Sequence, residues 1–306
     1  MSPHPLYGRM LAEKAMRDAA RSVQGKNFAS LEEANAFIQK VMENPDLVPP
    51  PATPLEEAEE LMYTLWELDD PRERLKIAMR AVELSMDCAD AWVYIADEVT
   101  KDLSDAIKCA RTGVIGGERA LGEDFIRENE GNFWNNVRTR PYMRALQTLA
   151  GYLWVAGCYE ESGELYLKML RLHPEDRPGI RHCVAMDFAE ADQDALFEAV
   201  IDGYAGDPMA SFTYGYALWL FRREGMTRTA DDALLTALHC NRFVPPYLLG
   251  SKRIPKRIPS HFTLGGEDEA VCYTQRAVGG WQATEGALAW LADRKRWITR
   301  QKKAKK

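Results

Sequence analysis

The amino-acid sequence predicts an all-α protein built as a superhelical array of antiparallel helix pairs. From residue 55 onward, apolar residues recur every three or four positions, and short turns separate the segments. No run of useful length alternates apolar and polar residues, and no hairpin signal is present. Residues 73–92 and 159–176 also share one pattern, which is typical of the second helix in a repeated pair.

The first predicted segment, residues 1–44, contains two short helices. Leu6 and Met10 begin an apolar face at helical spacing in the first helix. The second helix is predicted to begin after Ser30, because a serine followed three residues later by Glu33 forms a capping box. Both helices therefore precede the repeated region.

A proline-rich linker at residues 45–54 is predicted to form the main domain boundary. Five of these ten residues are prolines, and proline neither continues a helix nor leaves its predecessor free to do so. Thr53 and Pro54 then indicate a new helix, with threonine as the N-cap and proline at the first helical position. The repeat domain is predicted to cover residues 55–292, and a basic tail follows at 293–306.

Large and small residues recur along the repeat domain with a period of about 34 residues. A unit beginning at Met143 carries this pattern at Leu146, Leu149, Ala150, Leu153, Ser162, Tyr166, Met169 and Pro174. An earlier unit from Leu55 carries it at Ala58, Leu61, Ala78 and Ala81, and weaker units contain Trp92, Ile180 and Phe212. These units resemble the tetratricopeptide repeat, in which small residues let two helices approach and large residues fill the gap to the next pair. The resemblance implies an α-solenoid.

Three blocks of the chain carry a second resemblance. They are residues 91–118, residues 148–174, and residues 237–252 together with 266–291. The last block contains Val244-Pro245-Pro246-Tyr247-Leu248-Leu249, Trp281 and Glu285-Gly286-Ala287-Leu288. In their order and spacing these blocks resemble the suppressor-of-tumorigenicity-seven family. This chain has Arg242 where the family has proline, and it lacks the apolar membrane segments of the animal members. The resemblance implies a soluble, bacterial-type form and supports the fold more than a function.

Charge is unevenly distributed along the chain. The formal net charge is -7, but the last thirteen residues contain eight Lys or Arg and no acid, which leaves 31 basic against 46 acidic residues elsewhere. An acidic body disfavours binding of nucleic acid through the whole surface. The basic tail is typical of a solvated chain end, and a weak nucleic-acid contact through it is the alternative.

The sequence also predicts a cytoplasmic protein without membrane association. No run of about 18 apolar residues is present, and the N-terminus lacks the basic start and apolar block of a secretory signal. The six cysteines are scattered and form no C-x-x-C pair, which fits a reducing compartment better than a disulfide framework or a zinc site.

No short motif of a common catalytic site is present. The chain contains no H-E-x-x-H, no G-x-S-x-G and no G-x-x-x-x-G-K-[ST]. The pairs His182–Cys183 and His239–Cys240 do not predict a metal site, because neighbours on a helix point about 100° apart. The glycine-rich residues 113–122 are interpreted as a repeat turn, and acidic pairs such as Glu59–Glu60 as solvated helix starts. We therefore predict no enzyme, no cofactor and no metal.

A concave groove is the predicted binding site. In tetratricopeptide arrays the first helix of each pair lines this face, and Asp90 and Asp97 fall at inward positions. The predicted groove residues are Asn135, Asn136, Arg138, Arg140, Tyr142, Arg144, Gln147, Trp154, Arg181 and Phe188. Arginine forks and amides suit a carboxylate or an acidic peptide. The alternative is structural: the arginines pair with Glu128 and Glu130, and Trp154 packs in the core.

The leading hypothesis is a non-catalytic adaptor that binds an extended or helical segment of a partner protein in this groove. The alternative is an RNA-associated repeat protein that uses the basic tail, with Trp297 stacking on a base. A third hypothesis is an enzyme with an unrecognised site, for which the polar candidates near the middle of the chain are His173, Asp176, Arg140 and Tyr142.

Overall fold

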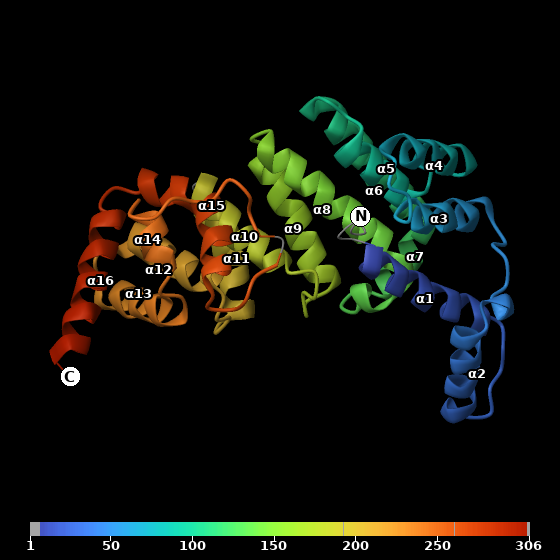
Figure 1. Ribbon diagram of the computed structural model, residues 1–306, viewed down its shortest axis with the longest axis horizontal. Coiled ribbons are helices and arrows are strands. Elements are labelled where there is room, and N and C mark those ends of the chain that lie inside the picture. The colour runs from blue at the N-terminus through green and yellow to red at the C-terminus, as the bar shows by residue number, and fades with distance from the viewer. Residues whose placement is uncertain (1–6, 192, 260, 305–306) are drawn as a thin grey trace. The chain divides into compact units, whose positions relative to one another are not determined.

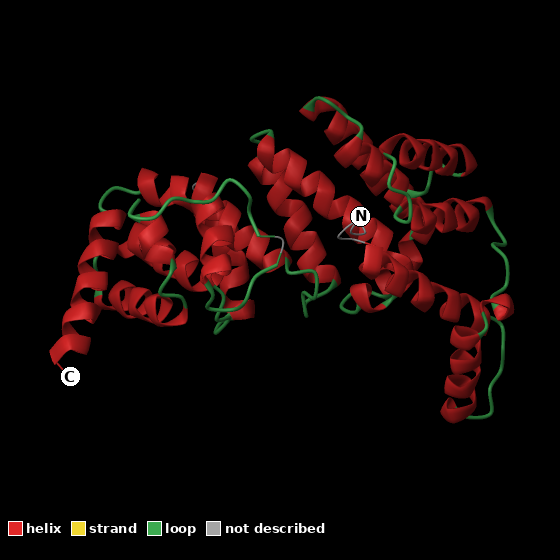
Figure 2. Ribbon diagram, viewed as in Figure 1, coloured by secondary structure: helices red, strands yellow, loops and turns green. Residues whose placement is uncertain are grey.

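The computed structural model describes the backbone of residues 7–191, 193–259 and 261–304, and the side chains of residues 8–188, 193–259 and 261–296. Every regular element in these ranges is a helix, as Figure 2 shows, which confirms the all-α prediction. The chain forms two compact units, Met1–Pro178 and Gly179–Lys306.

The first unit consists of helices joined mostly by short turns (Figure 1). Its α-helices are α1 (Tyr7–Val23), α2 (Leu31–Glu43), α3 (Pro54–Leu65), α4 (Pro71–Leu84), α5 (Ala89–Glu98), α6 (Leu103–Leu121), α7 (Glu123–Glu128), α8 (Arg140–Val155) and α9 (Tyr159–Leu172). Short 3-10 helices are η1 (Pro45–Leu47), η2 (Phe133–Asn135) and η3 (Val137–Thr139). α3 packs with α4, α5 with α6, and α8 with α9, so helix–turn–helix pairs follow one another along this unit.

The second unit contains α10 (Ile180–Ala191), α11 (Asp194–Ile201), η4 (Asp202–Tyr204), α12 (Ala210–Glu224), α13 (Arg228–Cys240), α14 (Val244–Leu248), α15 (Glu267–Ala283) and α16 (Ala287–Ala304). α12 packs with α13 as a hairpin, while α10 packs against both α12 and α15. Within the residues that the structure describes, no helix combines the length and the apolar character that crossing a bilayer requires.

The predicted helix starts are confirmed at their caps. The Ser30 hydroxyl accepts a hydrogen bond from the Glu33 N–H at 3.2 Å, and the Glu33 carboxylate accepts one from the Ala29 N–H at 2.7 Å. At the start of α3, the Thr53 hydroxyl accepts from the Glu56 N–H at 3.2 Å. Each cap satisfies backbone donors that have no partner inside the helix, which is why these short patterns mark the starts so well.

The proline-rich residues 45–54 lie inside the first unit, although we expected the main boundary there. The helices on either side of this segment contact each other, since α1 packs against α3. The chain divides instead between Pro178 and Gly179, within the predicted repeat domain 55–292. A stiff connector fixes the local backbone, but the contacts between the helices decide which segments form one unit.

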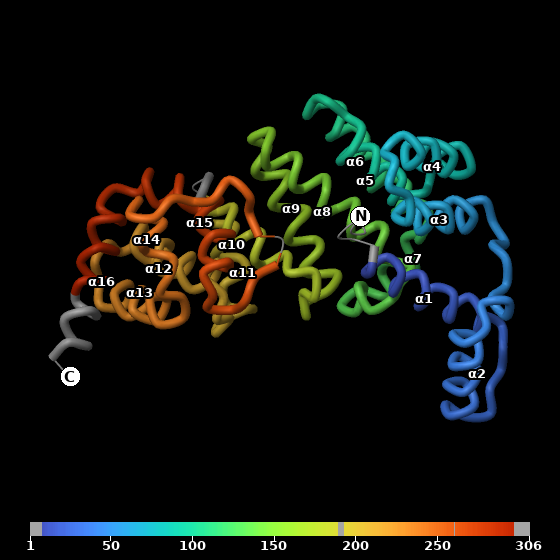
Figure 3. Tube along the Cα trace, viewed as in Figure 1, coloured from blue at the N-terminus to red at the C-terminus, as the bar shows by residue number. Residues whose placement is uncertain are grey.

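The glycine-rich residues 113–122 do not form the predicted turn. All but the last belong to α6, which Figure 3 shows as one unbroken coil. A Cβ on Gly116 would lie 2.9 Å from the carbonyl oxygen of Met86, and one on Gly117 would lie 2.9 Å from the Tyr142 ring. The glycines therefore let α6 approach its neighbours closely. A glycine-rich turn and a closely packed helix can have the same local composition, so the sequence did not distinguish them.

Gly116→Ala is expected to lower the free energy of unfolding by about 1–3 kcal/mol, because the added methyl group meets backbone atoms. Urea denaturation followed by circular dichroism measures this loss. Gly151→Ala is the matched control, since Gly151 lies inside α8 with no atom near the added carbon, and alanine there is expected to stabilise by about 0.5–1 kcal/mol. Equal effects of the two substitutions would contradict the close approach at Gly116.

Each unit buries large side chains among small ones. In the first pair of the first unit, Ala58 of α3 and Ala78 and Ala81 of α4 are fully buried, so the two helices can pack closely. In the second unit, Trp281 is fully buried and its indole N–H donates to the Tyr273 hydroxyl at 2.8 Å. The buried polar atoms of these aromatic side chains thus have partners, as a closed core requires.

Candidate interaction surface

Residues that the repeat pattern placed on an inward face lie together in the first unit. Asp90 and Asp97 of α5 and Arg144 and Gln147 of α8 line one cleft of about 360 Å³. Trp66, which directly follows α3, lines the same cleft, and residues of α1 form another part of its wall. The first helices of successive pairs, α3, α5 and α8, therefore share this surface.

Arg144 joins three helices through its guanidinium group. Its Nε and Nη2 donate to the Asp90 carboxylate of α5, each at 2.7 Å. Its Nη1 and Nη2 donate to the Glu13 carboxylate of α1 at 3.0 and 2.7 Å. Burial lowers the pKa of Arg144, but the two carboxylates raise it well above its usual value. Arg144 is thus a charged bridge with a bidentate pair on each side.

Glu13 is the acidic anchor of α1, and only 5% of it is exposed. It also accepts a hydrogen bond from the Tyr63 hydroxyl of α3 at 3.3 Å and one from Arg140 at 3.4 Å. Burial raises the pKa of Glu13, but Arg144 and Arg140 together bring it below its usual value. The carboxylate is therefore held in its charged form.

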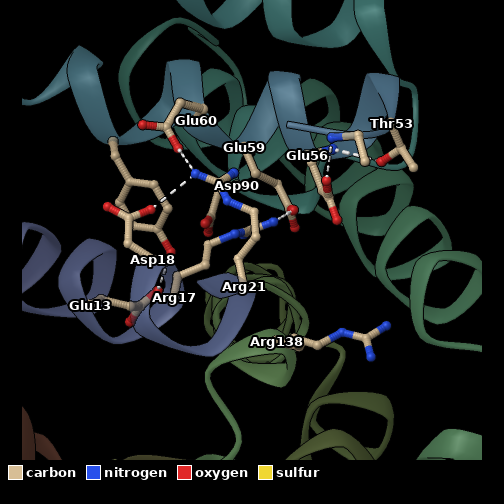
Figure 4. A network of polar contacts seen from close by, with 12 residues as sticks. Glu13, Arg17, Asp18, Arg21, Thr53, Glu56, Glu59, Glu60, Asp90 and Arg138 are labelled. Atoms are coloured by element: carbon tan, nitrogen blue, oxygen red, sulfur yellow. Dashed lines mark hydrogen bonds and ion pairs between the residues drawn. The ribbon is translucent and has the colours of Figure 1, made fainter. Parts of the chain in front are cut away.

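The basic side of α1 faces acidic residues of α3, as Figure 4 shows. Lys14 Nζ lies 2.6 Å from Glu60, Arg17 pairs with Glu59, and Arg21 lies 3.5 Å from Glu60. The prediction that the pair Glu59–Glu60 lies on a solvated helix face is wrong, because both side chains pair with α1. α1 lies between an acidic wall from α3 and a basic wall from α8.

A second cleft of about 610 Å³ lies along the C-terminal half of α1. Its lining includes Arg21 of α1, Thr53 at the start of α3, and the predicted groove residues Asn136 and Arg138. Arg138 is exposed, and its guanidinium carbon lies 4.8 Å from the centre of the Phe125 ring. α1 therefore borders one cleft along its N-terminal half and the other along its C-terminal half.

Three predicted groove residues are core residues instead. Tyr142 is buried, and its hydroxyl donates to Glu118 at 2.6 Å. Trp154 is 5% exposed, and Phe188 is fully buried. The repeat period places a side chain on a helix face, but neighbouring helices decide whether that face stays open. For Trp154, the alternative of core packing is the one that the structure supports.

The other predicted residues have identified contacts. Asn135 donates to the Asn132 side chain, and Arg140 lies 5.4 Å from the centre of the Trp134 ring. Arg181 belongs to the second unit, where it donates to Asp207 at 2.7 Å. The structure thus brings Arg140, Arg144 and Gln147 to α1 and its cleft, and it places Arg181 in another unit.

The predicted structural partners of the arginines are also corrected. Glu130 lies 3.4 Å from Arg171 rather than beside Arg140 or Arg144. The actual partners, Glu13 and Asp90, lie far from Arg144 in the sequence. Sequence reasoning missed α1 altogether as part of this surface, although the basic residues along α1 and the acids that begin α3 were a usable signal of opposite charge.

The other candidate positions contribute less to this surface. His173 and Asp176, considered for an unrecognised enzyme site, are buried where α9 ends. In the tail, Arg294 lies 2.8 Å from Asp231 of α13, and Arg296 pairs with Asp293. The predicted stacking residue Trp297 and the side chains after it lie outside the described side chains.

Comparison with known proteins finds distant relatives whose names agree with the resemblance to the suppressor-of-tumorigenicity-seven family. No protein-family profile matches the chain. A protein ST7 homolog of Drosophila melanogaster is 26% identical over 259 residues, which cover 76% of this chain and 47% of that protein. The ST7 homolog of Caenorhabditis elegans is 26% identical over 271 residues, covering 76% and 50%. A suppressor of tumorigenicity 7 protein-like of Gallus gallus is 25% identical over 264 residues, covering 78% and 46%. The chain therefore spans about half the length of the curated relatives it matches.

Proposed function

We propose that this chain is a non-catalytic scaffold that binds a helical segment of a partner protein along the inner face of its first unit. The observation that carries the proposal is the shared cleft, because Asp90, Asp97, Arg144 and Gln147 line it together. The 34-residue period of the tetratricopeptide repeat assigns these residues to inward positions. A surface built from successive repeats suits binding of an extended partner segment.

The order of the helix pairs supports a tetratricopeptide-like superhelical array. α3, α5 and α8 are the first helices of their pairs, and each contacts the next in that order. Their partners α4, α6 and α9 complete the pairs. In arrays of this type the first helices line the concave side, so the cleft lies where a binding face is expected.

The chemistry of the surface supports a helical protein segment as the ligand. α1 shows that a helix fits at this surface, because it packs against α3 and its Glu13 bonds to Arg144 of α8. The cleft beside α1 offers Trp66 for apolar contact and Gln147 for hydrogen bonding. Helix-in-groove recognition combines such contacts at positions three and four residues apart. A cytoplasmic location is part of the proposal, since the six scattered cysteines fit a reducing compartment.

A photo-crosslinking amino acid at position 147 tests this function in the native cell. We expect it to form an adduct with one protein, and the linked peptide to be helical in that partner. Lys108 of α6 is the matched control, because its side chain is 71% exposed and it does not line the cleft. Absence of a protein adduct at position 147, or the same adducts at both positions, would contradict the proposal.

A further inference from the structure

We infer that α1 is an exchangeable ligand of the inner face, and that the partner is a helix with the same side-chain pattern, which takes the place of α1. This inference rests on the proposed function and specifies the partner. The pattern consists of one apolar residue, one acid and three basic residues along one helix face: Met10, Glu13, Lys14, Arg17 and Arg21. Spacings of three, four, seven and eleven residues from Met10 place all five on one side of an α-helix.

Each position of this pattern meets a complementary group. Glu13 is held by Arg144 and Arg140 of α8, while the basic residues meet the acids of α3. Met10 is buried beside the cleft that contains Trp66. The surface therefore selects a largely basic helix with a carboxylate at the position of Glu13, because a helix without that acid would leave Arg144 paired only with Asp90.

α1 is held chiefly by polar contacts. Among residues 8–23, the buried ones are Met10, Glu13 and Ser22, and Leu11 and Met16 are exposed at 49% and 52%. Apolar burial contributes most of the free energy that holds a helix in a core. Because α1 buries one large apolar side chain, its undocking costs less free energy than that of a core helix. A helix with the same charges would replace each ion pair of α1 in kind, so the exchange would leave no buried charge without a partner.

α1 also leaves much of its binding surface open. The cleft of about 360 Å³ borders its N-terminal half at Met10 and Glu13, and the cleft of about 610 Å³ borders its C-terminal half at Arg17 and Arg21. Asn136 and Arg138 line the second cleft. A partner helix that is longer than α1, or has larger side chains, would make the contacts of α1 and would also fill the clefts. It could therefore replace α1.

A fluorescent peptide of residues 5–25 tests the exchange by anisotropy with the full chain. The variant Lys14→Glu, Arg17→Glu weakens the docked α1 and leaves α5 and α8 unchanged. We expect it to bind the peptide at least about tenfold more tightly than the wild-type chain does, because docked α1 competes for the surface. Lys76→Glu, Arg80→Glu on α4 is the matched control, since both side chains are exposed and lie outside the clefts.

The peptide itself provides a second comparison. A peptide with Glu13→Lys is expected to lose at least about tenfold in affinity, because a lysine would face Arg144. A peptide with Met16→Lys places a lysine at an exposed position of the same helix and is expected to bind as the natural sequence does. Equal binding of the two peptides would overturn the assignment of Glu13 as the anchor.

Two outcomes separate this inference from the proposed function. If no chain variant binds the peptide but position 147 still forms its protein adduct, then α1 is a fixed structural helix and the inference fails alone. If the peptide binds as expected but position 147 forms no protein adduct, the proposed function fails and the exchange of α1 stands. Hydrogen exchange in α5 and α8 verifies that each variant retains the fold.

Discussion

Replacing Arg144 with alanine is expected to lower the free energy of unfolding of the first unit by about 3–5 kcal/mol. The substitution removes the shared partner of two carboxylates, Glu13 and Asp90, whose side chains are 7% and 11% exposed. Breaking a buried ion pair from one side costs more than the pair contributes, because Asp90 loses both of its hydrogen bonds from Arg144 and Glu13 keeps only the longer contacts with Arg140 and Tyr63. Urea denaturation gives the magnitude, and hydrogen exchange in α1 and α5 locates the loss.

The matched control for this prediction is Arg80→Ala on α4. Arg80 also pairs with a glutamate, but its side chain is 60% exposed, so the expected change is below about 1 kcal/mol. Glu13→Gln combined with Arg144→Ala is expected to cost less than the sum of the two single substitutions, because the two side chains interact directly. A loss as small as that of Arg80→Ala would contradict the bridging role of Arg144.

The cost of Arg144→Ala is also expected to depend on pH. The pKa of Glu13 lies below its usual value of 4.5 in the folded chain, so its ionised form stabilises the fold fully above that pH. This contribution is lost as the pH falls through the folded pKa, because Glu13 then takes up a proton. The difference in stability between the wild type and the variant should therefore be largest near neutral pH and should shrink under acidic conditions.

Phe188→Ala is expected to lower the free energy of unfolding of the second unit by about 3–5 kcal/mol. Phe188 is fully buried, and its ring stacks on Phe197 with 4.1 Å between centroids. Removing the ring leaves a cavity lined by Phe197 and the nearby Gly215. Chemical denaturation gives the loss, and hydrogen exchange in α10 and α12 assigns it to this unit.

The matched control is Phe262→Ala, because Phe262 is 45% exposed and lies in a loop. It is expected to change the stability by less than about 0.5 kcal/mol. An unchanged stability together with weaker partner binding would contradict the buried position of Phe188. Phe188 would then line the groove, as the repeat pattern predicts.

Features that depend on a few neighbouring residues could be predicted from the amino-acid sequence. The caps at Ser30 and Thr53 lie where predicted, because a side-chain oxygen satisfies backbone N–H groups only two or three residues away. The absence of alternating patterns predicted the all-α class, and helical periodicity placed Arg144 and Gln147 on the same side of one helix. These inferences need only the backbone geometry of a single helix.

The sequence did not determine which helix faces stay open. Tyr142 and Phe188 occupy positions that the pattern assigned to a groove, yet both are buried by other helices. The glycines of α6 predict a turn by composition, because glycine is common at helix ends, but it also permits the close packing that the structure shows. Only the neighbouring elements distinguish these roles.

The partners of the charged residues depend on how distant helices pack together. Arg144 bonds to Glu13 at a separation of 131 residues, and Arg17 pairs with Glu59 across the proline-rich segment. The sequence shows these side chains as ordinary charges on amphipathic helices. The effect of such a charged side chain on stability depends on how completely packing excludes water from it and on which opposite charge lies beside it. Both conditions arise between helices that are distant in the sequence, so no local pattern contains them.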